Sequence, residues 1–144
     1  MAYGLYSKSN GYNVVVVDET TGNVITPLST ASNTTTSRLL SAAATTNGTS
    51  VKTTAGTIYG ITLYNASGAN KFLKFYNKAS APTVGTDVPI LTYLLPPAAT
   101  FFIDRSSGIY FSTGIAYAIT GLAAEAATTA VAAADILCLN IEYA

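Results

Sequence analysis

Apolar side chains alternate with small or polar ones along the chain from Gly108 to Thr120 (GIYFSTGIAYAIT). A period of two residues is typical of a β-strand, whose side chains point to opposite faces in turn. The larger apolar side chains would share one face: Ile109, Phe111, Ile115, Tyr117 and Ile119. The opposite face would carry Tyr110, Ser112, Gly114, Ala116 and Ala118, which are mostly small and apolar enough to be covered.

The last residues repeat this alternation. One face would carry Leu137, Leu139, Ile141 and Tyr143, and the other Ile136, Cys138, Asn140 and Glu142. Cys138 is the only cysteine and lies inside this apolar run. We therefore expect it to be a small buried side chain rather than a reactive thiol.

Between Arg38 and the segment that begins at Gly108, the pattern predicts further short strands, over 39–45, 50–54, 57–65, 71–78, 90–95 and 100–103. Asn47-Gly48 separates the first two, and this dipeptide is typical of a tight hairpin. Residues 121–134 are rich in alanine but lack a helical apolar stripe, so we expect a loop with at most one helical turn. Roughly eight to ten short strands predict an all-β protein, either an antiparallel β-sandwich or a jelly roll.

The N-terminal quarter differs from the rest. Asn13–Val17 is a short β-branched run, whereas residues 29–36 (STASNTTT) have few side chains that could join a core. Residues 1–37 are therefore interpreted as an N-terminal arm that reaches a neighbour, or as an ordinary edge strand, and residues 38–144 as the sandwich domain.

Composition limits the function. Seven Lys and Arg balance seven Asp and Glu, and only 10% of the 144 residues are charged, against about 25% in ordinary soluble domains. So few charges protect a lone monomer poorly from association, which favours a surface covered by partners. The start, MAYGLYSKSN, lacks the pattern of a signal peptide, and no apolar run approaches the ~20 residues of a membrane helix; we expect no membrane partner.

The chain also lacks most of the side chains that catalysis and metal binding require. It has no histidine and one cysteine, which excludes Ser-His-Asp and Cys-His catalysis and most zinc sites. The seven carboxylates are dispersed along the sequence, so neither a catalytic pair nor a calcium loop is indicated. We expect a protein that is not an enzyme and that holds no metal or cofactor.

Two segments are candidate contacts. In Lys71–Lys78 the residues Leu73 and Phe75 would point inward, and the opposite face would carry Phe72, Lys74, Tyr76 and Lys78. Basic and aromatic side chains in alternation also occur in single-strand nucleic-acid binders. The chain is neutral overall, however, so a solvent- or subunit-facing strand with lysines as edge protection is favoured and no nucleic-acid partner is expected.

The second candidate is the loop Ala81–Pro89. It is interpreted with equal weight as a contact with another subunit and as a rigid connection, because its prolines and glycine restrict the backbone. Its candidate contact residues are Pro82, Thr83, Val84, Gly85, Thr86 and Asp87.

Three blocks of sequence carry a resemblance to a known family: TTNGTSVKTTAGTIYGITLYNAS (45–67), KFLKFYNKASAPTVGTDVPILT (71–92) and SSGIYFSTGIAYAITGLA (106–123). Together with the loop 127–135 and the final strand, they resemble small virion proteins of tailed bacteriophages, in particular capsid decoration (cement) proteins. The resemblance begins near Leu40 and brings no catalytic or ligand residues.

The resemblance implies a β-sandwich that acts through its surfaces. Such a protein would be made in the host cytoplasm, form a homotrimer on the capsid exterior and bind across subunits of the major capsid protein. Similar domains also occur in tails and fibres, so the alternative is a tail, baseplate or fibre component that binds a host-surface glycan.

Overall fold

The computed structural model describes Val16–Val17, Val24–Ile25 and residues 34–144. The chain divides into two compact units, residues 1–33 and residues 34–144. In the first unit β1 (Val16–Val17) pairs antiparallel with β2 (Val24–Ile25), with Val16 opposite Ile25. The rest of the predicted arm up to residue 33 lies outside the described residues, and the second unit enters its first strand at Thr35.

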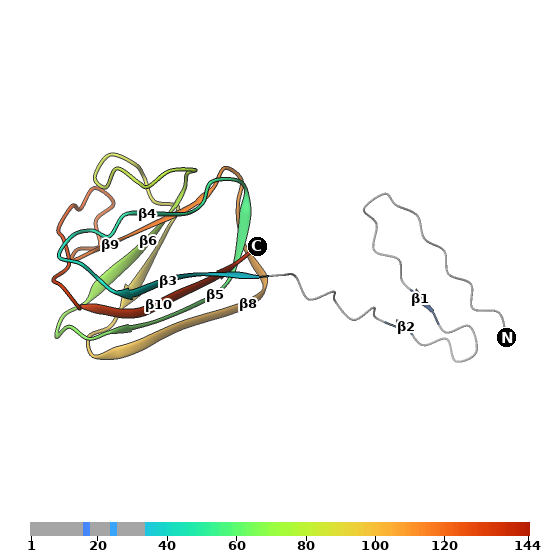
Figure 1. Cartoon of the computed structure of the whole chain (residues 1–144), viewed down its shortest axis with the longest axis horizontal. Coiled ribbons are helices and arrows are strands. Elements are labelled where there is room, and N and C mark those ends of the chain that lie inside the picture. The colour runs from blue at the N-terminus through green and yellow to red at the C-terminus, as the bar shows by residue number, and fades with distance from the viewer. Residues whose placement is uncertain (1–15, 18–23, 26–33) are drawn as a thin grey trace. The chain divides into compact units, whose positions relative to one another are not determined.

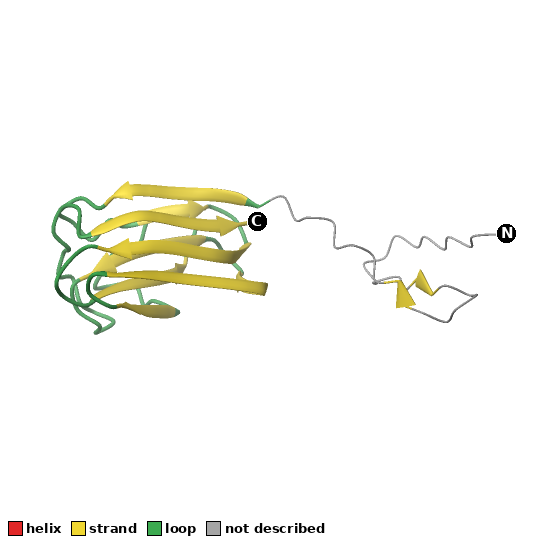
Figure 2. Ribbon diagram, turned by 90° about the horizontal axis from the view of Figure 1, so that it is seen from below, coloured by secondary structure: helices red, strands yellow, loops and turns green. Residues whose placement is uncertain are grey.

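The second unit consists of two four-stranded antiparallel sheets, seen as two layers in Figure 1 and Figure 2. The first sheet has the order β3 (Thr35–Ser41), β10 (Ile136–Tyr143), β5 (Gly56–Asn65) and β8 (Ala99–Phe111). The second has the order β4 (Thr49–Lys52), β9 (Ile115–Thr120), β6 (Lys71–Asn77) and β7 (Leu91–Leu95). The described residues form no helix, which confirms the all-β prediction.

The strand order is that of a jelly roll. Successive strands pass from one sheet to the other at every connection in this unit except β6 to β7, which are neighbours in one sheet. Eight strands in two such sheets are the jelly-roll arrangement, so the structure selects one of the two topologies that the sequence left open.

The core fills the space between the sheets. Phe75 of β6 is fully buried at its centre, and its ring lies 6.1 Å from that of Phe111, 6.3 Å from that of Tyr93 and 6.4 Å from that of Tyr117, measured between ring centroids. Tilted and edge-on aromatic pairs at this separation add to the stabilisation from burial. The other large buried apolar side chains are Ile58, Ile61, Leu63, Leu73, Leu95, Ile115, Ile119, Ile136, Leu139 and Ile141.

The alternation from Gly108 to Thr120 belongs to two strands rather than one. β8 ends at Phe111 in the first sheet, and β9 begins at Ile115 in the second. The predicted core face is nevertheless correct for Phe111, Ile115, Tyr117 and Ile119, which are all buried. Both strands direct these side chains into the space between the sheets, so alternation along the sequence does not reveal that the chain changes sheet.

The turn between β8 and β9 is fixed by Asn77. Its side-chain Nδ2 donates to Ser112 Oγ at 2.8 Å, and its side-chain Oδ1 accepts from the Thr113 N–H at 2.8 Å. A Cβ on Gly114 would lie 2.7 Å from Ala79 Cα and 2.8 Å from the Lys78 carbonyl oxygen. Only glycine fits this close approach of two backbone segments.

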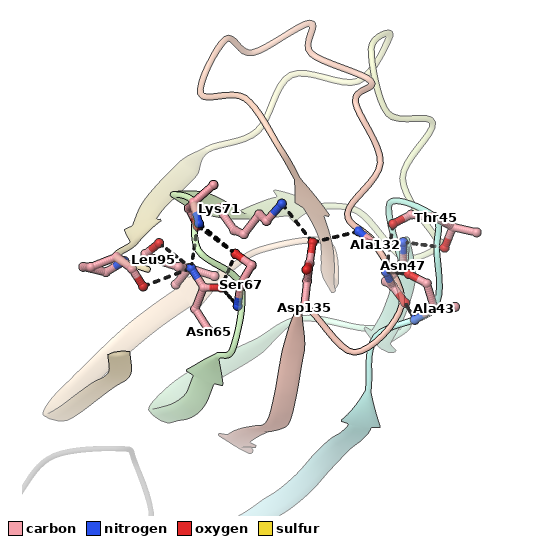
Figure 3. A network of polar contacts seen from close by, with 11 residues as sticks. Ala43, Thr45, Asn47, Asn65, Ser67, Lys71, Leu95, Ala132 and Asp135 are labelled. Atoms are coloured by element: carbon pink, nitrogen blue, oxygen red, sulfur yellow. Dashed lines mark hydrogen bonds and ion pairs between the residues drawn. The ribbon is translucent and has the colours of Figure 1, made fainter. Parts of the chain in front are cut away.

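The prediction of a tight hairpin at Asn47-Gly48 is wrong. β3 and β4 lie in different sheets, so this segment is a crossing between layers. A two-residue hairpin of this type needs positive φ at both residues, but only Asn47 of the pair has it, at 51°. The Asn47 side chain instead holds the corner: it donates to the Ala43 carbonyl at 3.0 Å and accepts from the Ala43 N–H at 2.9 Å (Figure 3).

A β-bulge changes the faces of the last strand. The register of β10 against β5 shifts between Leu137 and Asn140, and Cys138 has φ of 52°. Ile136 and Leu139 are both buried as a result, whereas Cys138 is exposed. The predictions that Leu137 shares the face of Leu139 and Ile141, and that Cys138 is buried, are therefore wrong, because an extra residue reverses the alternation before Leu139.

Residues 121–134 contain no helix or strand, as predicted. The loop ends at Asp135, which forms an ion pair with Lys71 at 2.8 Å and accepts from the Ala132 N–H at 2.8 Å (Figure 3).

The buried amide of Asn65 links the two sheets. Asn65 is the last residue of β5, and its Nδ2 donates to the carbonyl oxygens of Leu95 and Pro96, both at 2.9 Å, at the end of β7 (Figure 3). Its Oδ1 accepts from the N–H of Ser67 at 3.0 Å and from the hydroxyl of Ser67 at 2.7 Å. Every polar atom of this side chain therefore has a partner, as burial requires.

Candidate interaction surfaces

Two loops cover the small-residue face of the second sheet. Ala116 and Ala118 of β9 are completely buried on that face, and Tyr76 of β6 is 1% exposed beside them. Val84, from the loop after β6, packs against this cluster. The small face predicted from the sequence is thus covered, and the cover comes from the chain itself.

Lys74 is buried on the same face. Its Nζ donates to the Ala124 carbonyl at 2.5 Å and to the Glu125 carbonyl at 3.5 Å, so it fastens the loop after β9 onto the sheet. Burial lowers the pKa of Lys74, and the nearby carboxylate of Glu125 partly opposes this. Two carbonyl oxygens satisfy an ammonium that would otherwise be costly to bury.

β6 is a central strand, and the prediction that its lysines protect an edge is wrong. Leu73 and Phe75 point into the core, as predicted, but Lys74 and Tyr76 lie under the loops. The Tyr76 hydroxyl is buried without a hydrogen-bond partner, and burial, followed by the charge of Asp87, raises the pKa of Tyr76. These aromatic and basic side chains do not form a continuous exposed strip on which bases could stack.

The loop Ala81–Pro89 is built around Asp87. Its Oδ2 accepts from Lys78 Nζ at 2.5 Å and from the Thr83 N–H at 2.6 Å, while the N–H groups of Thr86 and Asp87 donate to the Thr83 carbonyl. Gly85 has φ of 92°, and a Cβ there would lie 2.5 Å from Thr128 Cγ2. These bonds support a rigid connection; the face that the loop leaves exposed for a contact consists of Thr83, Gly85, Thr86 and Val88.

The two bonded aspartates make the stability of the fold sensitive to acid. The Lys78 hydrogen bond, then the Thr83 N–H, lowers the pKa of Asp87. For Asp135, burial raises the pKa, but the hydrogen bonds from Lys71 and the Ala132 N–H outweigh it and the pKa is lowered. A carboxyl group whose pKa is lower in the folded than in the unfolded chain contributes to stability. The contribution is complete above the pKa of the unfolded chain, about 4, and it is lost as the pH falls through the pKa of the folded chain.

We therefore expect the free energy of unfolding, measured by urea denaturation, to be lower at about pH 3 than at about pH 6. A variant with both Asp87→Asn and Asp135→Asn should be less stable at the higher pH and should lose less stability on acidification. If the variant lost as much free energy of unfolding between the two pH values as wild type does, other groups would be responsible for the acid sensitivity.

The other sheet carries a different surface, which we call the outer face of the first sheet. It exposes four large apolar or aromatic side chains, Leu40 (62% exposed), Tyr64 (39%), Phe102 (70%) and Tyr110 (67%), on β3, β5 and β8. Arg38 and Asp104 lie on the same face, two residues from Leu40 and Phe102 respectively. Exposed apolar side chains gathered on one sheet face are typical of an interaction surface.

Alternation along the sequence predicts only part of this surface. Alternation around Ile61 and Leu63, which face the core, indicates that Thr62 and Tyr64 point outward. Phe102 lies in the short strand that the pattern predicts over 100–103, but a run this short does not indicate which way its side chains point. The strand β8 is in fact much longer than that run.

Within residues 34–144 and the two short strands before them, no three acidic, histidine or cysteine side chains lie together as metal ligands would. Among the same residues no helix is long and apolar enough to cross a membrane. No protein-family model, curated protein or solved structure matches the chain.

Proposed function

We propose that the chain is a structural virion protein that decorates and stabilises a bacteriophage capsid by binding across major-capsid subunits. The observation that carries the proposal is the outer face of the first sheet, on which Leu40, Tyr64 and Phe102 expose apolar area. The sequence resemblance supports the same function. Jelly rolls are found in viral capsid domains and in lectins, which is an analogy at the level of the fold.

The physical requirements of a cement protein agree with such a face. Apolar and hydroxyl-bearing side chains can be covered with little charge to desolvate, so each contact with a capsid subunit costs little in lost hydration. Many copies bound to one particle make a modest affinity per contact sufficient. Self-association, expected to be trimeric, would place several such faces side by side.

The first experiment is a binding assay with capsids assembled without the chain. We expect saturable binding and slower loss of particle integrity on heating. Replacing Tyr64 by serine should weaken binding about tenfold, as expected when an aromatic side chain that anchors an interface is truncated. The control Val88→Ser removes an even more exposed apolar side chain (66%, against 39% for Tyr64) from the loop over the other sheet and should leave binding unchanged.

Absence of binding to such capsids would refute the proposal.

The second candidate, recognition of a host glycan, is favoured by Tyr110, which is 67% exposed on β8. A glycan array that showed saturable binding, lost in Tyr110→Ala, would replace the capsid proposal with this one.

A further inference from the structure

The four edge strands of the two sheets differ in how well they are protected from pairing with another strand. β4 has four residues and a register shift, and β7 has five residues between Pro89 and Pro96. Short strands, irregular register and prolines are devices that prevent edge-to-edge association. β3 has none of them: it has seven residues, no proline and an uninterrupted register against β10.

β8 is the opposite edge of the sheet that begins with β3, and only part of it is regular. It pairs with β5 continuously from Ala99 to Asp104, after which the register shifts around Gly108. Its regular part therefore offers a second open edge, beside the exposed ring of Phe102.

We propose that β3 of one copy of the chain pairs antiparallel with residues 99–104 of β8 in a second copy, with Leu40 opposite Phe102 and Arg38 opposite Asp104. Strand direction permits this, because β3 and β8 already run in opposite directions within the sheet. The joined edges would extend the alternating antiparallel order from one copy into the next.

The register of this pairing satisfies both faces at once. Leu40 and Arg38 point outward on β3, and Phe102 and Asp104 point outward on β8. On the inner side the same register places Leu39 opposite Ile103, and both of these side chains pack against the core of their own copy. A shift by one residue would oppose outward and inward side chains, which is unfavourable when one face is buried.

The charges identify a second copy as the partner. Arg38 and Asp104 form no ion pair within the described part of the chain. They lie at opposite edges of one sheet, so pairing them directly requires two molecules. Each of the two residues also has an oppositely charged residue in its own copy: Glu142 on β10 lies on the same face as Arg38, and Arg105 follows Asp104 on β8. Pairing with these residues would not bring Leu40 and Phe102 together, as the pairing of two copies does.

The contact joins two different edges, so it is heterologous. Such contacts close into a ring when the rotation between copies permits. The inference thus specifies the surface for the self-association in the proposed function, on which it rests only for the expected size of the ring. It leaves the outer face of the two inner strands, β10 and β5, with Tyr64 near the end of β5, for a capsid.

Light scattering after size exclusion of the full chain tests the inference at micromolar concentrations. We expect wild type to exceed the mass of a single chain. Arg38→Asp or Asp104→Arg alone should weaken association about tenfold or more, because like charges would face each other. The double variant with both changes should regain most of the wild-type affinity. The control pair Lys52→Glu and Glu125→Lys changes charge on the other sheet and its loop and should have no effect.

A second pair of variants tests the apolar contact. Leu40→Ser and Phe102→Ser should each weaken association. The control Leu122→Ser should not, although Leu122, which lies outside the first sheet, is also well exposed (56%, against 62% for Leu40 and 70% for Phe102). A wild-type chain that stays single, a double charge variant that does not recover, or equal loss in the controls would each overturn the inference. A single chain in which the β3 amides that point away from β10 are also protected from hydrogen exchange would identify its own N-terminal residues as the occupant instead. Capsid binding by a chain that stays single would overturn the inference and leave the proposed function standing.

Discussion

Replacing Phe111 by alanine is expected to lower the free energy of unfolding by about 3–5 kcal/mol. Phe111 is completely buried at the end of β8, and its ring contacts that of Phe75 at a centroid distance of 6.1 Å. Removing the ring takes away apolar burial and leaves a cavity between the sheets. The surrounding side chains come from both sheets, so they can collapse into the cavity only if the layers move together.

Urea denaturation at neutral pH measures this effect, and the adjacent Tyr110 provides the control. Tyr110 lies in the same strand but is 67% exposed, so Tyr110→Ala should cost less than about 1 kcal/mol. Similar losses at the two positions would mean that the assignment of core and outer faces in β8 is wrong.

Replacing Asn65 by alanine is expected to lower the free energy of unfolding by about 2–4 kcal/mol. The variant removes the donors to the Leu95 and Pro96 carbonyls and the acceptor for Ser67, and it leaves these groups without their partner. Asn65 is completely buried and its bond to the Leu95 carbonyl is buried too, so that carbonyl loses a hydrogen bond without regaining bulk water.

Two further variants separate this explanation from a simple loss of volume. Asn65→Asp keeps the size and the acceptor but directs a carboxylate at carbonyl oxygens, so it should be at least as destabilising as alanine at neutral pH. Asn140→Ala removes an amide that donates locally to the Cys138 carbonyl at 3.1 Å and should have little effect. A mild Asn65→Asp phenotype would contradict the role of the amide donors.

The sequence predicts the composition of the core better than its arrangement. Alternation assigned Phe111, Ile115, Tyr117 and Ile119 to the core, and all four are buried. It could not show that the chain changes sheet between Phe111 and Ile115, since an inward side chain has the same pattern on either layer. The order of strands in the two sheets depends on long-range pairing, which local patterns do not encode.

Local irregularities explain most of the errors. A single extra residue near Cys138 exchanges the faces at the start of β10, at Ile136 and Leu137, whereas Leu139 and Ile141 are buried on the predicted face. At Asn47-Gly48 only Asn47 has the positive φ that the expected hairpin needs at both residues, and the segment crosses between sheets. Alternation places Lys74 on the face opposite Leu73 and Phe75, which predicts a solvent- or subunit-facing side chain, but the carbonyl oxygens that bind it belong to a loop fifty residues later. Each of these features depends on a partner or a backbone angle that a residue's own neighbourhood in sequence does not specify.

The place of β10 has a consequence for synthesis of the protein. β10 is formed by residues 136–143 and lies between β3 and β5, so two strands made early are joined only by one made last. On the ribosome, the first sheet cannot be completed until these residues have emerged. Pairing between strands so distant in sequence is slow to form, and until then the open sides of β3 and β5 depend on dilution or on chaperones to avoid pairing with other nascent chains.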